Sequence, residues 1–240
     1  MRDFFEAPIT ASAYRHKASE LCKKFMSKLV VIMLIYMAIT AAASFVDSLF
    51  SIPSEIQDPT AGTITIKYTV GIVSLLLSGP LSFSLILVAQ KVYQDIVPEA
   101  GDVFAGFRQF GRAFVVSFLS GLYIALWSLL IIPAFIKPFS YAMAPYIAID
   151  NPELSANQCI TESRKMMNGY KWKLFCLHFS YIGWYFLCGL TLGILTLWVI
   201  PKVRQAEYLF YLKVSGKGIE MEEMKKADQS EFEVVFESEN

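Results

Sequence analysis

A small group of ionisable residues lies where the sequence is otherwise apolar, and these are the first candidates for chemistry. His178 falls within the apolar run from Leu174 to Pro201, and Lys202, Arg204 and Glu207 follow that run directly. An ionisable side chain inside a membrane is costly and marks a functional site by default, such as a polar cavity or a proton relay. The ordinary alternative is a neutral, hydrogen-bonded histidine, with the other three residues solvated on a cytoplasmic extension of the last helix. The sequence leaves both interpretations open.

Other patterns that carry chemistry are missing from the sequence. It contains no Ser-His-Asp order, no HExxH zinc motif, no Walker phosphate loop and no GxGxxG motif. His178 has no second intramembrane histidine and no spaced carboxylate to complete a metal site. The cysteines (Cys22, Cys159, Cys176 and Cys188) show no metal-ligand spacing and are expected to be reduced, buried residues. We therefore expect no catalytic residue, no metal and no cofactor.

The composition of the chain indicates which elements must position these residues. Hydrophobic residues make up 55% of the sequence and charged residues only 18%, below the roughly 25% of soluble domains. Four long runs carry no Asp, Glu, Lys or Arg, and each is close to or above the roughly 20 residues that a helix needs to cross a bilayer. These runs are Leu29 to Val46, Tyr68 to Gln90, Ala113 to Ile136 and Leu174 to Pro201. The sequence therefore predicts an all-α, polytopic transmembrane helical bundle.

Charge placement predicts the orientation of the chain. The net charge is zero, with 21 basic and 21 acidic residues, so there is no global attraction to nucleic acid. Residues 1–28 are rich in lysine and arginine, whereas the loop from Phe50 to Lys67 carries only Lys67, so the N-terminus is expected to be cytoplasmic. Within residues 1–28, an amphipathic helix is expected to face anionic lipid headgroups of the inner leaflet.

The number of spans can be read in two ways. In a four-span interpretation, Leu174 to Pro201 is one tilted helix and residues 133–150 lie on the surface. In a six-span interpretation, residues 133–150, 172–188 and 192–212 form the last three spans. Six spans leave only Lys67 and Lys137 outside, whereas four spans add to them Arg164, Lys165, Lys171 and Lys173. Because cytoplasmic loops carry the excess of basic residues, we expect six spans with both termini cytoplasmic.

Four prolines are expected to break or bend the spans. Pro80 follows Gly79 near the middle of the second span and should kink it. Pro133 and Pro138 predict a turn at the outer end of the third span, because neither can donate a backbone hydrogen bond. Pro201 ends the last apolar run.

Three polar segments complete the organisation of the chain. Residues 98–112 are expected to form an interfacial helix with Asp102 as N-cap. A second helix is expected to begin at Asn151-Pro152 and stop at Asn168-Gly169. The chain then divides into an amphipathic N-terminal helix (1–28), a transmembrane domain (29–212) and a disordered, acidic cytoplasmic tail (213–240).

The segment from Leu126 to Tyr211 resembles a known family. It contains LWSLLIIPAFIKPFSYAMAPYIAIDNP, then SRKMMNGYKWKLFCLHFSYIGW, then LTLGILTLWVIPKVRQAEYLFY. These motifs are similar to those of the bacterial integral membrane family known as domain of unknown function 975. Two residues depart from the pattern: Ala134 replaces a usual glycine, and Lys202 stands where a tyrosine is expected. The resemblance implies a multi-pass protein of a prokaryotic cytoplasmic (plasma) membrane, and it carries no activity that could be transferred.

Two functions from different classes fit these observations. The first is a non-enzymatic membrane helper, scaffold or assembly factor that binds membrane lipids and a membrane-protein partner or a second copy of itself. The alternative is a transporter or permease-like component that moves a small or lipidic solute through a cavity at the interrupted helices. A continuous polar cavity near His178 and Lys202 would favour the transporter.

Overall fold

The computed structural model describes residues 2–49, 52–58, 62–68, 71–128 and 131–224. Apart from one β-hairpin, the regular elements in this part of the chain are helices. In chain order the elements are α1 (Arg2–Glu6), α2 (Ala11–Lys24), α3 (Met26–Leu49), β1 (Ile52–Asp58), β2 (Gly62–Tyr68), α4 (Ile72–Tyr93), the 3-10 helix η1 (Ala100–Gln109), α5 (Phe110–Ser128), α6 (Ile131–Tyr141), α7 (Ala144–Asp150), α8 (Ala156–Met166), α9 (Lys171–Phe179), α10 (Ile182–Leu190) and α11 (Thr196–Ser215).

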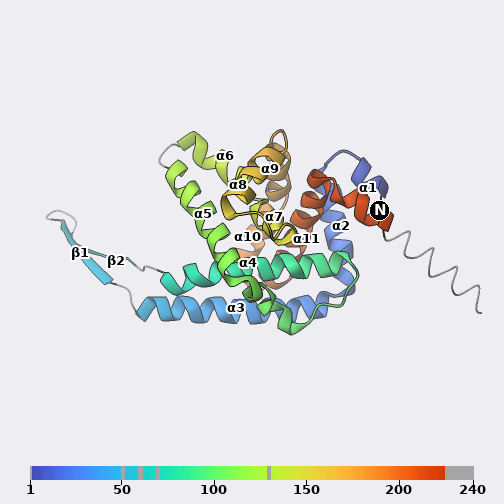
Figure 1. Ribbon diagram of the computed structural model, residues 1–240. Coiled ribbons are helices and arrows are strands. Elements are labelled where there is room, and N and C mark those ends of the chain that lie inside the picture. Colours follow the sequence, from blue (N-terminus) through green and yellow to red (C-terminus); the bar gives the residue numbers. More distant parts are fainter. Residues whose placement is uncertain (1, 50–51, 59–61, 69–70, 129–130, 225–240) are drawn as a thin grey trace, which may run out of the picture.

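Helices α3 and α4 run side by side, and the hairpin projects beyond one end of the pair (Figure 1). The strands β1 and β2 are antiparallel, where the sequence analysis predicts only a polar loop. The alternation of threonine and isoleucine along β2 is the period-two signal for this hairpin. At the hairpin end, the buried carboxylate of Asp47 accepts hydrogen bonds from the backbone N–H groups of Val73 and Ser74, at 3.0 and 2.9 Å. Asp47 therefore satisfies the first turn of α4 and ties its start to the end of α3.

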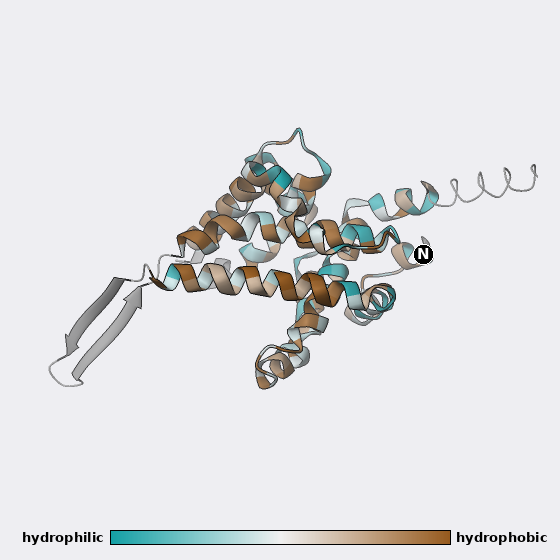
Figure 2. Cartoon of the chain, turned by 90° about the horizontal axis from the view of Figure 1, so that it is seen from below, coloured by the Kyte–Doolittle hydropathy of each residue, from teal (hydrophilic) through white to brown (hydrophobic). Residues whose placement is uncertain are grey.

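Three helices of the described chain are long and apolar enough to cross a membrane: Met26–Leu49, Ile72–Tyr93 and Ala100–Trp127, the last of which joins η1 to α5. They match the first three predicted spans. Figure 2 shows hydrophobic residues along the long helices next to the hairpin, with hydrophilic residues gathered at the opposite end. A largely helical chain with three membrane-capable helices agrees with the predicted class of a transmembrane helical protein, and the hairpin is an addition to it.

The expectation of six spans is not supported, and the single last helix of the four-span interpretation is wrong. The predicted fourth span is divided between α6 and α7, of 11 and 7 residues, and the fifth between α9 and α10, of 9 residues each. Helix α11 has 20 residues but carries lysine, arginine and glutamate side chains along its length. Helices α6, α7, α9 and α10 are too short to cross a membrane, and α11 is too highly charged.

The predicted prolines do not end helices. Pro80, Pro138 and Pro201 lie inside α4, α6 and α11, and Pro133 is the third residue of α6. The turn predicted between Pro133 and Pro138 is therefore wrong. Helix interiors tolerate proline where neighbouring groups satisfy the freed carbonyl. The breaks occur instead at Ala142–Met143, Ser180–Tyr181 and 191–195, where both Leu192 and Gly193 adopt positive φ angles of 51° and 86°.

After α5, helices α6 and α7 bring the chain back to the start of α5. Arg112, in the first turn of α5, donates from Nε to the Ala148 carbonyl at 2.8 Å and from its other nitrogens to the carbonyls of Asn151 and Pro152. These carbonyls lie at the C-terminal end of α7, where a cation is favoured by the helix dipole. The end of α7 therefore lies beside the start of α5.

Two helix starts differ from those predicted. Asn151 is the C-cap of α7, and α8 begins after Ser155, whose side chain and that of Gln158 form a capping box. Likewise η1 begins after Glu99, and Asp102 accepts from the Glu99 N–H at 2.8 Å as the third helical residue. The stop at Asn168-Gly169 is confirmed, since α8 ends at Met166 and Gly169 has a φ of 81°.

The two ends of the described chain pack together. The apolar face of α2, which includes the buried residues Tyr14 and Ala18, packs against α11 rather than facing a lipid surface. The tail predicted to be disordered is helical over residues 217–224, so that prediction is wrong for this part, while residues 225–240 lie outside the described chain. Glu222 accepts a hydrogen bond from the Tyr93 hydroxyl at 2.8 Å, and a Cβ at Gly218 would lie 2.6 Å from the Phe5 ring.

Candidate functional site

Helix α11 carries three of the four ionisable residues singled out from the sequence: Lys202, Arg204 and Glu207. Their spacing along the helix places two of them on one face and Lys202 on another. Successive residues of an α-helix are about 100° apart, so Arg204 and Glu207, three positions apart, share a face. The Arg204 guanidinium donates to Glu207 Oε2 at 2.9 Å. His178 of α9 lies on the same side, with its Nε2 3.3 Å from Glu207 Oε1.

A tyrosine that the sequence analysis missed completes this cluster. The Tyr146 hydroxyl, from α7, donates to Glu207 Oε2 at 3.0 Å, and the Tyr146 side chain is 3% exposed. The Glu207 carboxylate therefore accepts hydrogen bonds from α7 and α11 and lies beside His178 of α9, and such pairing is how a buried charge is normally stabilised. We call Tyr146, His178, Arg204 and Glu207 the Glu207 cluster.

Neighbouring tyrosines repeat the same tyrosine–carboxylate contact. The Tyr211 hydroxyl donates to Asp150 at 2.7 Å, in addition to the contact between Tyr93 and Glu222. The rings of Tyr146 and Tyr211 stack with their centroids 5.3 Å apart. These contacts join α4, α7, α11 and residues 217–224 into one interior. The partners in these contacts are far apart in the sequence. They leave no local pattern from which the contacts could be predicted.

The Glu207 cluster lines a small cavity. The cavity has a volume of about 160 Å³ and reaches Ser82 and Ile86 of α4, close to Pro80. Small-molecule sites usually measure about 300–1,000 Å³. The cavity could therefore hold water or a small ion, and its size does not fit a larger solute.

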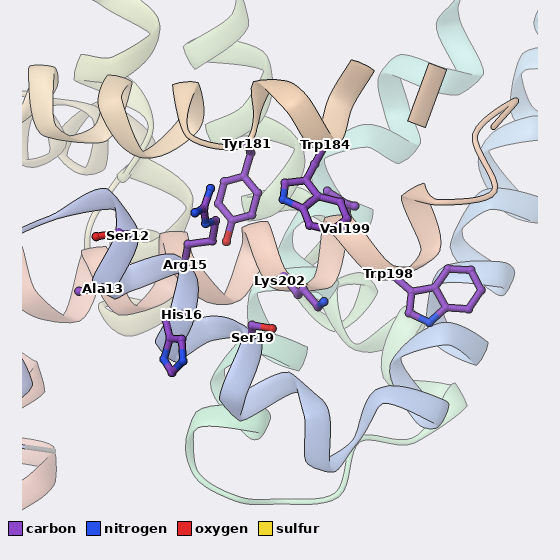
Figure 3. A pocket seen from close by; sticks show the side chains of 10 residues that line it. All are labelled: Ser12, Ala13, Arg15, His16, Ser19, Tyr181, Trp184, Trp198, Val199 and Lys202. Carbon is purple, nitrogen blue, oxygen red and sulfur yellow. The ribbon is translucent and has the colours of Figure 1, made fainter. Parts of the chain in front are cut away.

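Lys202 does not belong to this cluster. It lines a second and larger cavity, of about 620 Å³, between α2, α10 and α11 (Figure 3). Of the residues that the structure describes, none lines both cavities. The structure thus brings three of the four predicted polar residues together, His178, Arg204 and Glu207, and places Lys202 elsewhere.

The structure also bears on metal binding and on the cysteines. Within the described residues, no three His, Cys, Asp or Glu side chains are grouped so as to hold a metal ion. All four cysteines are free, with Cys22 and Cys159 buried and Cys176 and Cys188 half-buried. Burial raises the pKa of the Cys22 thiol to about 12, so this thiol stays protonated and poorly reactive at neutral pH.

The comparison with protein families agrees with the resemblance seen in the motifs. No curated protein and no solved structure matches the chain. Residues 129–218 match the model of a family described as "Protein of unknown function (DUF975)". The matched segment runs from the end of α5 into the helical segment after α11, and it contains the whole Glu207 cluster. Over these residues, somewhat more than a third of the chain, the protein is similar to the DUF975 family.

Proposed function

We propose that this chain is a non-enzymatic, multi-pass membrane protein that acts as a scaffold or assembly factor. It holds a partner membrane protein through lateral helix contacts. The N-terminus and the end of α11 lie on the cytoplasmic side of a prokaryotic plasma membrane. This orientation rests on the basic residues before α3.

The observation that carries this proposal is the exposure of α10, in which eight of nine residues are exposed and Cys188 is half-buried. None of its residues is buried, although the flanking residues Leu174, Leu177 and Leu197 all pack into the interior. Phe186 and Leu190 are 69% and 68% exposed. Nine residues extend about 14 Å, too short to cross a bilayer as a separate helix. Exposed aromatic residues on such a short helix are typical of the core of a protein–protein contact.

A photo-cross-linking amino acid at Phe186 tests the proposal in intact membranes. The matched control is the same probe at Leu122 of α5, an apolar residue that is 46% exposed on a helix long enough to face lipid along its length. We expect a discrete protein adduct from Phe186 and none from Leu122. Lipid adducts alone at Phe186 would contradict the proposal, as would a protein adduct found only at Leu122.

A transporter is the alternative, and one observation favours it. Ala142 and Met143, at the break between α6 and α7, line the cavity of the Glu207 cluster, and interrupted helices near charged side chains are common at transport sites. Against transport stand its volume of about 160 Å³ and the lack of lining residues shared with the cavity at Lys202. Uptake of a small ion that depends on Glu207, measured in vesicles, would support the alternative over the scaffold.

A further inference from the structure

The cavity between α2, α10 and α11 has the size of a ligand site and an unusual lining. Its volume is about 620 Å³, within the usual range of small-molecule sites. Arg15 and His16 enter it from α2 and Lys202 from α11, and among the described residues no acidic side chain lines it (Figure 3). The lining therefore selects for an anion.

The cations of this cavity are not neutralised by the rest of the described chain. No described carboxylate lies within salt-bridge distance of Arg15 or Lys202. Arg15 donates one hydrogen bond, to the Ser180 carbonyl at 2.8 Å, which orients the guanidinium and leaves further N–H groups free. Both side chains are half-buried, so their charge is less screened than it would be on an open surface.

A buried hydroxyl without a partner lies in the wall of the same cavity. Tyr181 is 2% exposed, and among the described residues its hydroxyl has no hydrogen-bond partner. Figure 3 shows this hydroxyl directed towards Arg15. Tyr14, Ser120 and Gln205 also carry buried unpaired groups, but of these four residues Tyr181 alone lines this cavity, where its hydroxyl can donate to an added acceptor.

The remaining wall of the cavity is apolar and continues onto an exposed apolar surface. Trp184 and Trp198 line it and are 44% and 39% exposed. Trp184 belongs to α10, whose Leu187 and Leu190 are also exposed. Tryptophan is enriched where headgroups meet acyl chains. The ligand is therefore expected to combine an anionic head with apolar chains.

We propose that this cavity binds the phosphate headgroup of an anionic phospholipid, with the acyl chains lying along α10. Arg15 and Lys202 pair with the phosphate, and the Tyr181 hydroxyl donates a hydrogen bond to one of its oxygens. The cavity lies between α2, α10 and α11. Trp184 and Phe186 lie about 200° apart around α10, so acyl chains along the Trp184 side leave the Phe186 side free for a protein contact.

Lipid competition on the detergent-purified full chain tests the proposal. Native mass spectrometry measures the bound fractions of phosphatidylglycerol and phosphatidylcholine, offered at equal concentration. The double variant Arg15→Gln/Lys202→Gln should lower the preference for phosphatidylglycerol by about tenfold or more, since a charge-assisted contact is worth at least one factor of ten. The double variant Lys23→Gln/Lys28→Gln makes the same change in net charge at exposed positions outside the cavity, and it should change the preference by less than about twofold.

Tyr181→Phe keeps the inference testable if the double variant fails to fold. It removes only the hydroxyl, so it should weaken phosphatidylglycerol binding about two- to tenfold while leaving the thermal unfolding midpoint unchanged or higher. Equal effects of the cavity and control double variants would overturn the proposal, as would unchanged binding by Tyr181→Phe. Displacement of phosphatidylglycerol by millimolar inorganic phosphate would show a site for soluble phosphate and overturn the lipid assignment.

Discussion

At the scale of single residues, each buried carboxylate of the described chain accepts a hydrogen bond. Glu207 accepts hydrogen bonds from Tyr146 and Arg204 and lies 3.3 Å from His178, while Tyr93 donates to Glu222 in a separate pair. A buried ion pair adds little stability compared with apolar residues of the same size, but removing one partner leaves an uncompensated charge. The Glu207 cluster is therefore expected to be most sensitive to the loss of one member.

Glu207→Leu should lower the free energy of unfolding by about 1–3 kcal/mol, because the half-buried Arg204 guanidinium then lacks its carboxylate. The double variant Arg204→Leu/Glu207→Leu should recover most of this loss. Chemical unfolding of the detergent-purified protein measures both. Glu162→Leu is the matched control, since it removes the acid of the exposed pair with Lys165 and should cost about 0.5 kcal/mol or less. A double variant as unstable as Glu207→Leu would show that the ion pair is not the cause.

At the scale of elements, close backbone contacts hold η1 and α5 against α4. A Cβ at Gly79 would lie 2.6 Å from the Ala113 carbonyl oxygen, and a Cβ at Gly106 would collide with the Pro80 carbonyl. The Gly106 N–H also donates to Ser84 Oγ at 3.0 Å. Glycine is needed at these two positions because no side chain fits between the backbones.

Gly106→Ala should lower the unfolding free energy by about 1–3 kcal/mol, because the added methyl group forces η1 away from α4. Gly111→Ala, in the first turn of α5, provides the control, since a Cβ there meets no atom within 4 Å. Thermal unfolding in detergent compares the two variants. Equal midpoints for Gly106→Ala and Gly111→Ala would refute the close contact.

The helical segment after α11 is a second element with a testable role. Truncation after Met224 should leave the thermal midpoint unchanged, because it removes none of the described contacts. Truncation after Ser215 should destabilise the protein by about 2 kcal/mol or more, because Tyr93 loses its carboxylate partner and the Phe5 ring loses its cover. Membrane accumulation at equal expression gives a parallel measurement. Equal stability of the two truncated chains would mean that residues 216–224 contribute nothing to the fold.

At the scale of the whole molecule, the two ends of the long helices differ in character. The hairpin extends beyond one end, and α1, α2 and the end of α11 gather at the other (Figure 1). The Lys213 ammonium donates to the carbonyl of Phe5 in this second region, and the contacts of Arg112 place Asn151 at the start of α5. The return through α6 and α7 therefore brings the chain back across most of the length of α5.

Labelling of introduced cysteines by a membrane-impermeant thiol reagent tests this arrangement. Gln57→Cys, in the hairpin, should react in intact cells. Ile96→Cys and Glu153→Cys should react only after the cells are opened, because residue 96 follows the other end of α4 and residue 153 lies near Arg112. The background carries Cys176→Ala and Cys188→Ala and retains the buried Cys22 and Cys159. Labelling of Glu153→Cys in intact cells would contradict the return of α6 and α7 to the start of α5. Labelling of Ile96→Cys in intact cells would contradict the cytoplasmic position of the end of α4.

The sequence by itself determined the elements whose signals are local. Unbroken apolar runs predicted α3, α4 and α5, helical periodicity predicted the apolar face of α2, and Asn168-Gly169 predicted the end of α8. Each of these depends on neighbours within a few helical turns, so periodicity and turn chemistry suffice.

Only the tertiary structure decided which groups meet. The sequence grouped Lys202 with Arg204 and Glu207, but Lys202 lines a different cavity together with Arg15, almost the whole length of the chain away. It also gave no sign that Tyr93 pairs with Glu222 or that α2 covers α11 instead of lipid. These contacts depend on how separate helices pack, and the same apolar face or charged side chain is compatible with lipid, water or protein until its neighbour is known.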